Sequence, residues 1–155
     1  MKRTLLAACA AALLLIPASN AWSWGIGASF GLNDLGGNPG QNVMASIKLD
    51  ETPFLFGIGG RISDGNVTLG LTADWWMVHK NLVNFLNYYI GPGLYFALSE
   101  EIELGGRLPI GINAYPLDPL ELFLEIAPTI ALLAPEGIEF PNLGLQGAIG
   151  FRFWF

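Results

Sequence analysis

The chain has 155 residues, of which 52 % are hydrophobic and only 13 % charged, with 20 glycines and a formal net charge of −6. This composition is too apolar for an ordinary soluble domain and too rich in glycine for a helical bundle. The acidic balance and the absence of a basic patch argue against nucleic acid as a partner.

Residues 1–21 are predicted to be a secretory signal peptide. Lys2 and Arg3 precede a short apolar run, and small residues precede Trp22. The apolar run is shorter than the ~17–25 residues that a membrane-spanning helix needs. Its cysteine, Cys9, does not fit a lipoprotein cleavage box, because only eight residues precede it and the apolar run continues past it.

The second predicted domain is the mature chain, residues 22–155, which contains no cysteine and therefore has neither a disulfide nor a thiolate metal site. It keeps five of the seven Lys and Arg residues but all 13 Asp and Glu residues, so its net charge is −8. No mature segment is apolar for long enough to form a transmembrane helix.

The mature chain divides into stretches that alternate apolar with small or polar residues, separated by Gly, Pro, Asp and Asn. This period of two predicts eight strands, at 22–32, 42–50, 54–63, 67–78, 86–98, 102–115, 120–133 and 143–155. Most are at or above the ~9–11 residues that cross a bilayer at a tilt. The last strand ends on Phe155, which is typical of bacterial outer-membrane β-barrels. The predicted fold is therefore all-β, an eight-stranded antiparallel transmembrane β-barrel with both termini on the periplasmic side.

Nine charged residues fall within these strands, and all lie on the face opposite the bulky apolar row. They are Lys48, Asp50, Arg61, Asp74, Glu103, Arg107, Glu121, Glu125 and Arg152. A soluble lipid-carrying barrel would have the reverse arrangement, with polar residues outside. A charge facing hydrocarbon costs about 2–4 kcal/mol at the bilayer midplane, so lipid favours an outer face without charges.

The lumen of an eight-stranded barrel is just wide enough for side chains to fill. We expect a structural polar cluster there, formed by Arg61, Asp74, Glu103, Arg107, Glu121, Glu125 and Arg152. Counting back from the turns places Arg107 near Glu125, and Glu121 near Arg152. Such pairs would plug the lumen.

Aromatic residues gather at the ends of the predicted strands, where interfacial girdles form. We expect girdles at both ends of the barrel, built by Trp22, Trp24, Phe54, Phe56, Trp75, Trp76, Tyr88, Phe151, Phe153, Trp154 and Phe155.

No catalytic, cofactor or metal site is predicted. Lipid-modifying barrels need a nucleophile and a base near the outer rim, but the only histidine, His79, falls in the predicted turn after the fourth strand, without a serine. Glu121 and Glu125 share a strand face and could act as paired catalytic carboxylates. We favour them as partners of Arg107 and Arg152.

Four segments carry a family resemblance: 88–93 (YYIGPG), 106–113 (GRLPIGIN), 119–128 (PLELFLEIAP) and 147–155 (GAIGFRFWF). They are similar to a small outer-membrane β-barrel family of unknown function that was first grouped in spirochaetes and resembles barrels of the outer-membrane-protein A type. The resemblance covers about half of the mature chain. It implies an eight-stranded barrel in the outer membrane and supplies no catalytic residues.

The expected function is that of a non-enzymatic, monomeric protein of the bacterial outer membrane with a structural or envelope-stabilising role. One alternative is a surface-binding, adhesin-like protein that uses the outer loops 33–41 and 134–142. The other is a narrow pore for water or small ions. Expected partners are outer-membrane lipid and the barrel-assembly machinery, which would recognise the strand that ends in Phe155.

Overall fold

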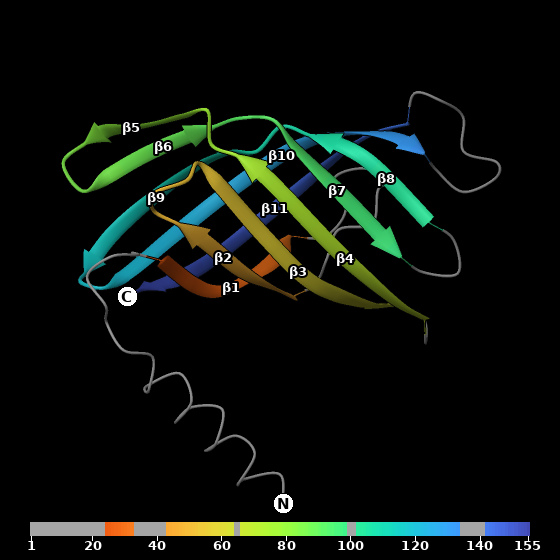
Figure 1. Cartoon of the computed structure of the whole chain (residues 1–155), viewed down its shortest axis with the longest axis horizontal. Coiled ribbons are helices and arrows are strands. Elements are labelled where there is room, and N and C mark those ends of the chain that lie inside the picture. The colour runs from red at the N-terminus through yellow and green to blue at the C-terminus, as the bar shows by residue number, and fades with distance from the viewer. Residues whose placement is uncertain (1–23, 33–42, 64–65, 99–101, 134–141) are drawn as a thin grey trace, which may run out of the picture.

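The computed structural model describes residues 24–32, 43–63, 66–98, 102–133 and 142–155, and these form eleven strand segments (Figure 1). The segments are β1 (Trp24–Leu32), β2 (Val43–Leu49), β3 (Phe54–Ser63), β4 (Asn66–Trp75), β5 (Val78–Val83), β6 (Leu86–Ile90), β7 (Gly93–Leu98), β8 (Ile102–Arg107), β9 (Ile110–Leu117), β10 (Leu120–Leu133) and β11 (Asn142–Trp154).

The eleven segments build an eight-stranded antiparallel barrel. Three long strands are each divided in two, as β4 with β5, β6 with β7, and β8 with β9. Both halves of the third divided strand, β8 and β9, pair with β10. The sheet closes because β11 pairs with β1 on one side and with β10 on the other. The predicted all-β, eight-stranded fold is confirmed. The signal peptide expected at residues 1–21 lies outside the described residues.

Prolines explain two of the three divisions. A proline has no backbone N–H to donate to a neighbouring strand, and Pro92 and Pro109 stand where β6–β7 and β8–β9 are interrupted. Their carbonyls still accept hydrogen bonds, from the backbone N of Trp75 at 2.9 Å and of Gly91 at 3.3 Å. The wall is therefore continuous across the interruptions.

The register between neighbouring strands determines the tilt of the strands relative to the barrel axis. From Leu55 on β3, successive partners in one direction are Asp74, Gly93, Arg107, Thr129 and Gly144. In the other direction they are Lys48, Gly25 and Trp154. The two paths reach β11 ten residues apart, at Gly144 and Trp154, so the shear number is ten. Eight strands with this shear have a tilt within the usual ~35–45° and a narrow interior.

The wall has the reverse polarity of a soluble domain. Among the described residues, thirty large hydrophobic side chains are exposed, whereas ten of the eighteen residues that form its buried hydrophobic and polar sets are polar or charged. Along β10 the burial alternates strictly from Glu121 to Thr129. Every charged residue of the segments β1–β4 and β7–β11 lies on the inner-facing parity. No described helix is long and apolar enough to cross a membrane.

One predicted boundary is wrong. The fourth strand does not end near residue 78 but continues through β5, which forms a hairpin with β6 around Asn84 and Phe85. Asn84 has φ 45°, a left-handed conformation that asparagine tolerates better than most residues. This hairpin lies at the end of the barrel that holds the C-terminus (Figure 1), which we call the terminal end.

Candidate functional site

The polar lumen is the candidate site, and its deepest element is an ion pair. Arg152 on β11 and Glu121 on β10 are register partners, and Arg152 Nη1 lies 2.8 Å from Glu121 Oε1. Both side chains have 0 % exposure, so solvent does not screen the pair. Arg152 Nε also donates to Ser46 Oγ at 2.8 Å, and the guanidinium lies 4.0 Å from the centre of the Phe123 ring.

Glu121, the acceptor of this pair, accepts two further hydrogen bonds. Asn113 Nδ2 donates to Oε1 at 2.9 Å and Trp154 Nε1 donates to Oε2 at 2.8 Å. His79 Nε2 lies 3.3 Å from Asn113 Oδ1, within hydrogen-bonding distance. A chain of polar contacts therefore connects the exposed ring of His79 to the fully buried carboxylate of Glu121.

A second ion-pair cluster lies around Arg107. This guanidinium pairs with Glu125 on β10 and with Asp74 on β4, where Arg107 Nε lies 3.3 Å from Asp74 Oδ1. Asp74 and Arg107 both pair in register with Gly93, which lies between them on β7. A side-chain carbon at Gly93 would overlap Asp74 Oδ1. The absence of a side chain at Gly93 therefore lets two charged groups meet across an intervening strand.

Tyrosines complete the hydrogen bonding of the buried carboxylates. Tyr89 Oη donates to Glu125 Oε2 at 2.8 Å, and Tyr95 Oη donates to Glu103 Oε1 at 2.6 Å. Buried carboxylates are stable only when paired or hydrogen-bonded, and each of these has a charged or phenolic partner. Arg61, on the inner-facing parity of β3, is half-buried and also has an interaction partner.

Aromatic rings close the lumen toward the terminal end. Trp76 and Tyr89 stack with their centroids 3.9 Å apart, and the His79 ring lies 5.1 Å from Trp76. Lys48 Nζ lies 5.3 Å from the Trp76 ring and donates to the carbonyls of Leu49 and Thr52, each at 2.6 Å. This layer of rings and cations leaves little space for a solute.

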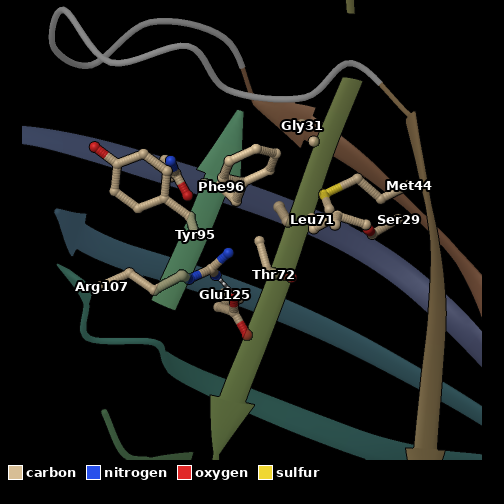
Figure 2. Close-up of a pocket in the computed structure, with 13 residues that line it drawn as sticks. Ser29, Gly31, Met44, Leu71, Thr72, Tyr95, Phe96, Arg107 and Glu125 are labelled. Atoms are coloured by element: carbon tan, nitrogen blue, oxygen red, sulfur yellow. Dashed lines mark hydrogen bonds and ion pairs between the residues drawn. The ribbon is translucent and has the colours of Figure 1, made fainter. Parts of the chain in front are cut away.

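Two small cavities, each of about 40 Å³, lie in the lumen between the described residues. Both are lined by Ser29, Met44, Thr72, Arg107 and Glu125. Figure 2 shows Arg107 and Glu125 pointing toward each other in the first of them. A cavity of this size holds only a few water molecules. In the described part of the chain, no three His, Cys, Asp or Glu residues form a group that could hold a metal ion.

The structure brings together both ion pairs expected from the turns, Arg107 with Glu125 and Glu121 with Arg152. The Arg107–Asp74 contact was not expected, because two strand spacings separate the residues. Tyr89, Tyr95 and Asn113 were also missed. Strand alternation could have found them, because each lies on the face opposite the outward apolar row of its strand.

Several expectations about placement are corrected. His79 is not a turn residue but pairs with Tyr89 inside β5–β6. Asp50 is exposed in a turn rather than buried in the lumen. Trp76 is 4 % exposed and Trp154 donates to Glu121, so both belong to the lumen and not to a girdle. Girdles were expected at both ends of the barrel, and this expectation is wrong for the described aromatic residues, which all lie toward the terminal end.

No family model matches the chain, and no curated protein matches it by sequence. Among solved structures, it is similar to the crystal structure of neisserial surface protein A (NspA), with a TM-score of 0.50. The fold is that of a small outer-membrane β-barrel. The match covers 90 % of this chain and 100 % of the NspA chain at 12 % identity, so it concerns the fold alone.

Proposed function

We propose that the chain is a monomeric, non-enzymatic protein of the bacterial outer membrane, whose barrel spans the bilayer and has a structural role in the envelope. One observation carries the proposal: the closed wall has an apolar outside that is free of charges along β1–β4 and β7–β11, and an ion-paired inside. Exposed apolar surface of this extent is incompatible with a soluble monomer. Hydrocarbon around the barrel would make the same surface favourable.

Two features support the same membrane boundary at the terminal end. Outward-facing aromatic pairs gather there, with ring centroids 6.3 Å apart for Phe54–Trp75 and 5.2 Å for Trp24–Phe155. Immediately beyond Trp75, β5 pairs with β6 along one edge only. Its other edge has no partner strand among the described residues, so β5 is the edge strand of the described sheet. An open sheet edge cannot lie in hydrocarbon, because its backbone groups would have no partners. The hydrocarbon would therefore end near Trp75, with β5 in the headgroup region or in water.

The composition of the lumen supports a structural rather than a catalytic role. The buried carboxylates have charged or phenolic partners, and the cavities between them are the size of a few water molecules. A substrate would have to displace the ion pairs to enter. Removing one partner of a buried pair costs about 3–5 kcal/mol.

A narrow pore for water or small ions is the second candidate. It is favoured by the two cavities, which have six lining residues in common and so lie next to each other around Arg107. The aromatic layer of Trp76 and Tyr89 argues against continuous conduction. The adhesin-like alternative stays a prediction, because residues 33–42 and 134–141 lie outside the described part of the chain.

We further propose that barrel assembly uses the C-terminal strand. Its last residue, Phe155, exchanges backbone hydrogen bonds with Trp24: Phe155 N to Trp24 O at 2.9 Å, and Trp24 N to Phe155 O at 3.3 Å. The closing seam of the barrel therefore includes the terminal aromatic residue, and recognition of this residue by assembly machinery would precede closure.

Expression of the full chain in a bacterium with an outer membrane, followed by fractionation, tests the proposed location. The expected product fractionates with the outer membrane and migrates differently on a gel before and after boiling. Planar-bilayer recordings on the purified barrel test the plug, and the expected result is no sustained conductance. Recovery of a freely soluble folded protein would contradict the membrane assignment, and steady channels would favour the pore.

A further inference from the structure

The outer wall has an apolar cavity of about 520 Å³, much larger than either lumen cavity. It lies over β2, β3, β4, β7 and β8, and we call it the wall groove. Its principal side chains are Phe56, Ile58, Leu71, Ala73, Leu94 and Phe96. All six have outward-facing parity on their strands, so the groove opens away from the lumen.

The groove exists because one residue of the wall is small. Ala73 on β4 is the register partner of Phe56 on β3 and of Leu94 on β7. The methyl group of Ala73 thus lies between two large side chains and forms the floor. In the next outward row, Leu71 lies between Ile58 and Phe96 and extends the depression toward the other end of the barrel.

The width of the groove restricts what can occupy it. Phe56 and Leu94 are two strand spacings apart, about 9–10 Å between backbones. After their side chains are accounted for, one alkyl chain fits, whereas a helix is about 10–12 Å across. An extended peptide is also unsuitable, because the apolar side chains that line the groove could not satisfy its backbone groups.

The position of the groove matches one leaflet of the bilayer. It begins two residues beyond the Phe54–Trp75 pair, which we place at the membrane boundary. Leu71 is four residues from Trp75, about 13 Å along the strand. An acyl chain that enters at the aromatic boundary would therefore lie along the groove toward the bilayer midplane.

We infer that the wall groove binds one acyl chain of a phospholipid from the leaflet at the terminal end of the barrel. This inference rests on the proposed membrane location. Between two hydrocarbon environments there is no hydrophobic gain, so binding depends on close van der Waals packing against the groove walls. The bound lipid therefore exchanges with the surrounding bilayer more slowly than its neighbours do.

The test fills the groove without touching the lumen. The variant Ala73→Phe and the control Ala28→Phe both enlarge an outward-facing alanine, but Ala28 lies on β1, outside the groove. Each purified barrel is titrated in detergent with palmitoyl-oleoyl phosphatidylethanolamine, and bound lipid is counted by native mass spectrometry. We expect Ala73→Phe to reduce one-to-one lipid retention by about fivefold, as most contacts of the chain are lost, and Ala28→Phe to retain it.

Three outcomes would overturn the inference. Equal retention by Ala73→Phe and the unaltered chain would show that the groove holds no lipid, and equal loss in both variants would show a general surface effect. Efficient disulfide dimerisation of Ala73→Cys in membranes would assign the groove to a second copy. Outer-membrane fractionation and gel mobility of the same variants separate these outcomes from failure of the proposed location.

Discussion

Tyr89 on β6 donates a hydrogen bond to Glu125 on β10 although β9 lies between their strands. The residue between them in register is Gly111, which pairs with both. A side-chain carbon at Gly111 would overlap the Tyr89 ring. The Tyr89 phenol therefore passes over Gly111 to reach the Glu125 carboxylate. Asp74 and Arg107 meet across Gly93 in the same way.

The substitution Gly111→Ala should therefore displace the Tyr89 ring and weaken its hydrogen bond to Glu125. We expect a loss of about 1–3 kcal/mol in the free energy of unfolding, as for other overpacked interiors. Urea unfolding of the barrel in lipid vesicles measures it. The matched control is Gly106→Ala, where the added carbon makes only ordinary contact with Ile130, at 3.5 Å. Equal effects of the two substitutions would refute the role of Gly111.

The Arg152–Glu121 pair should be strongly coupled. Replacing either residue alone, as in Arg152→Met or Glu121→Gln, is expected to cost about 3–5 kcal/mol of unfolding free energy, because the partner is left buried and uncompensated. The double variant should cost clearly less than the sum of the single variants. A double-mutant cycle in vesicles measures the coupling, and simple additivity would show that the two groups do not act as a pair.

Much of this architecture could be predicted from the sequence because the period of two sorts outward-facing from lumen-facing residues. Turn positions then fixed the register of adjacent strands closely enough to pair Arg107 with Glu125. The Arg107–Asp74 contact could not be predicted in this way. It depends on Gly93 in a third strand and on two registers at once, β4 with β7 and β7 with β8.

The two tryptophan errors have a different cause. Trp76 and Trp154 follow the outward-facing Trp75 and Phe153, so alternation alone places them inside. Aromatic composition near strand ends suggested a girdle instead, and the alternation proved the better guide. The β5–β6 hairpin was missed because a register shift between Asn81 and Val83 disrupts the apolar pattern there.

Tyr95 should contribute to stability through its hydroxyl group. Tyr95→Phe removes the donor that lies 2.6 Å from Glu103 Oε1, which leaves a buried carboxylate without that partner and should cost about 1–3 kcal/mol. The comparison variant is Tyr115→Phe, whose hydroxyl accepts only a 3.4 Å contact from Asn113. Unfolding midpoints of the two variants give the answer, and a larger effect at Tyr115 would contradict this account of the lumen.

The aromatic layer should act as the barrier to ion flow. Truncating both stacked rings, in Trp76→Ala with Tyr89→Ala, is expected to produce brief openings in planar-bilayer recordings where the unaltered barrel is silent. Trp75→Ala serves as the control, because this ring is 45 % exposed on the outer wall. If the doubly truncated barrel remains silent despite correct folding, the ion-paired clusters and not the rings form the barrier.

The account depends on hydrocarbon surrounding the apolar face of β4. Cysteine substitutions at residues 67–75, each carrying a nitroxide label in the reconstituted barrel, test this by collision with oxygen and with a water-soluble nickel complex. We expect high oxygen and low nickel accessibility at Leu69, Leu71 and Ala73. At the alternating positions Thr68, Gly70 and Thr72 we expect either high nickel with low oxygen accessibility or low accessibility to both reagents. Nickel accessibility at Leu71 equal to that of a water-exposed site would contradict the central claim.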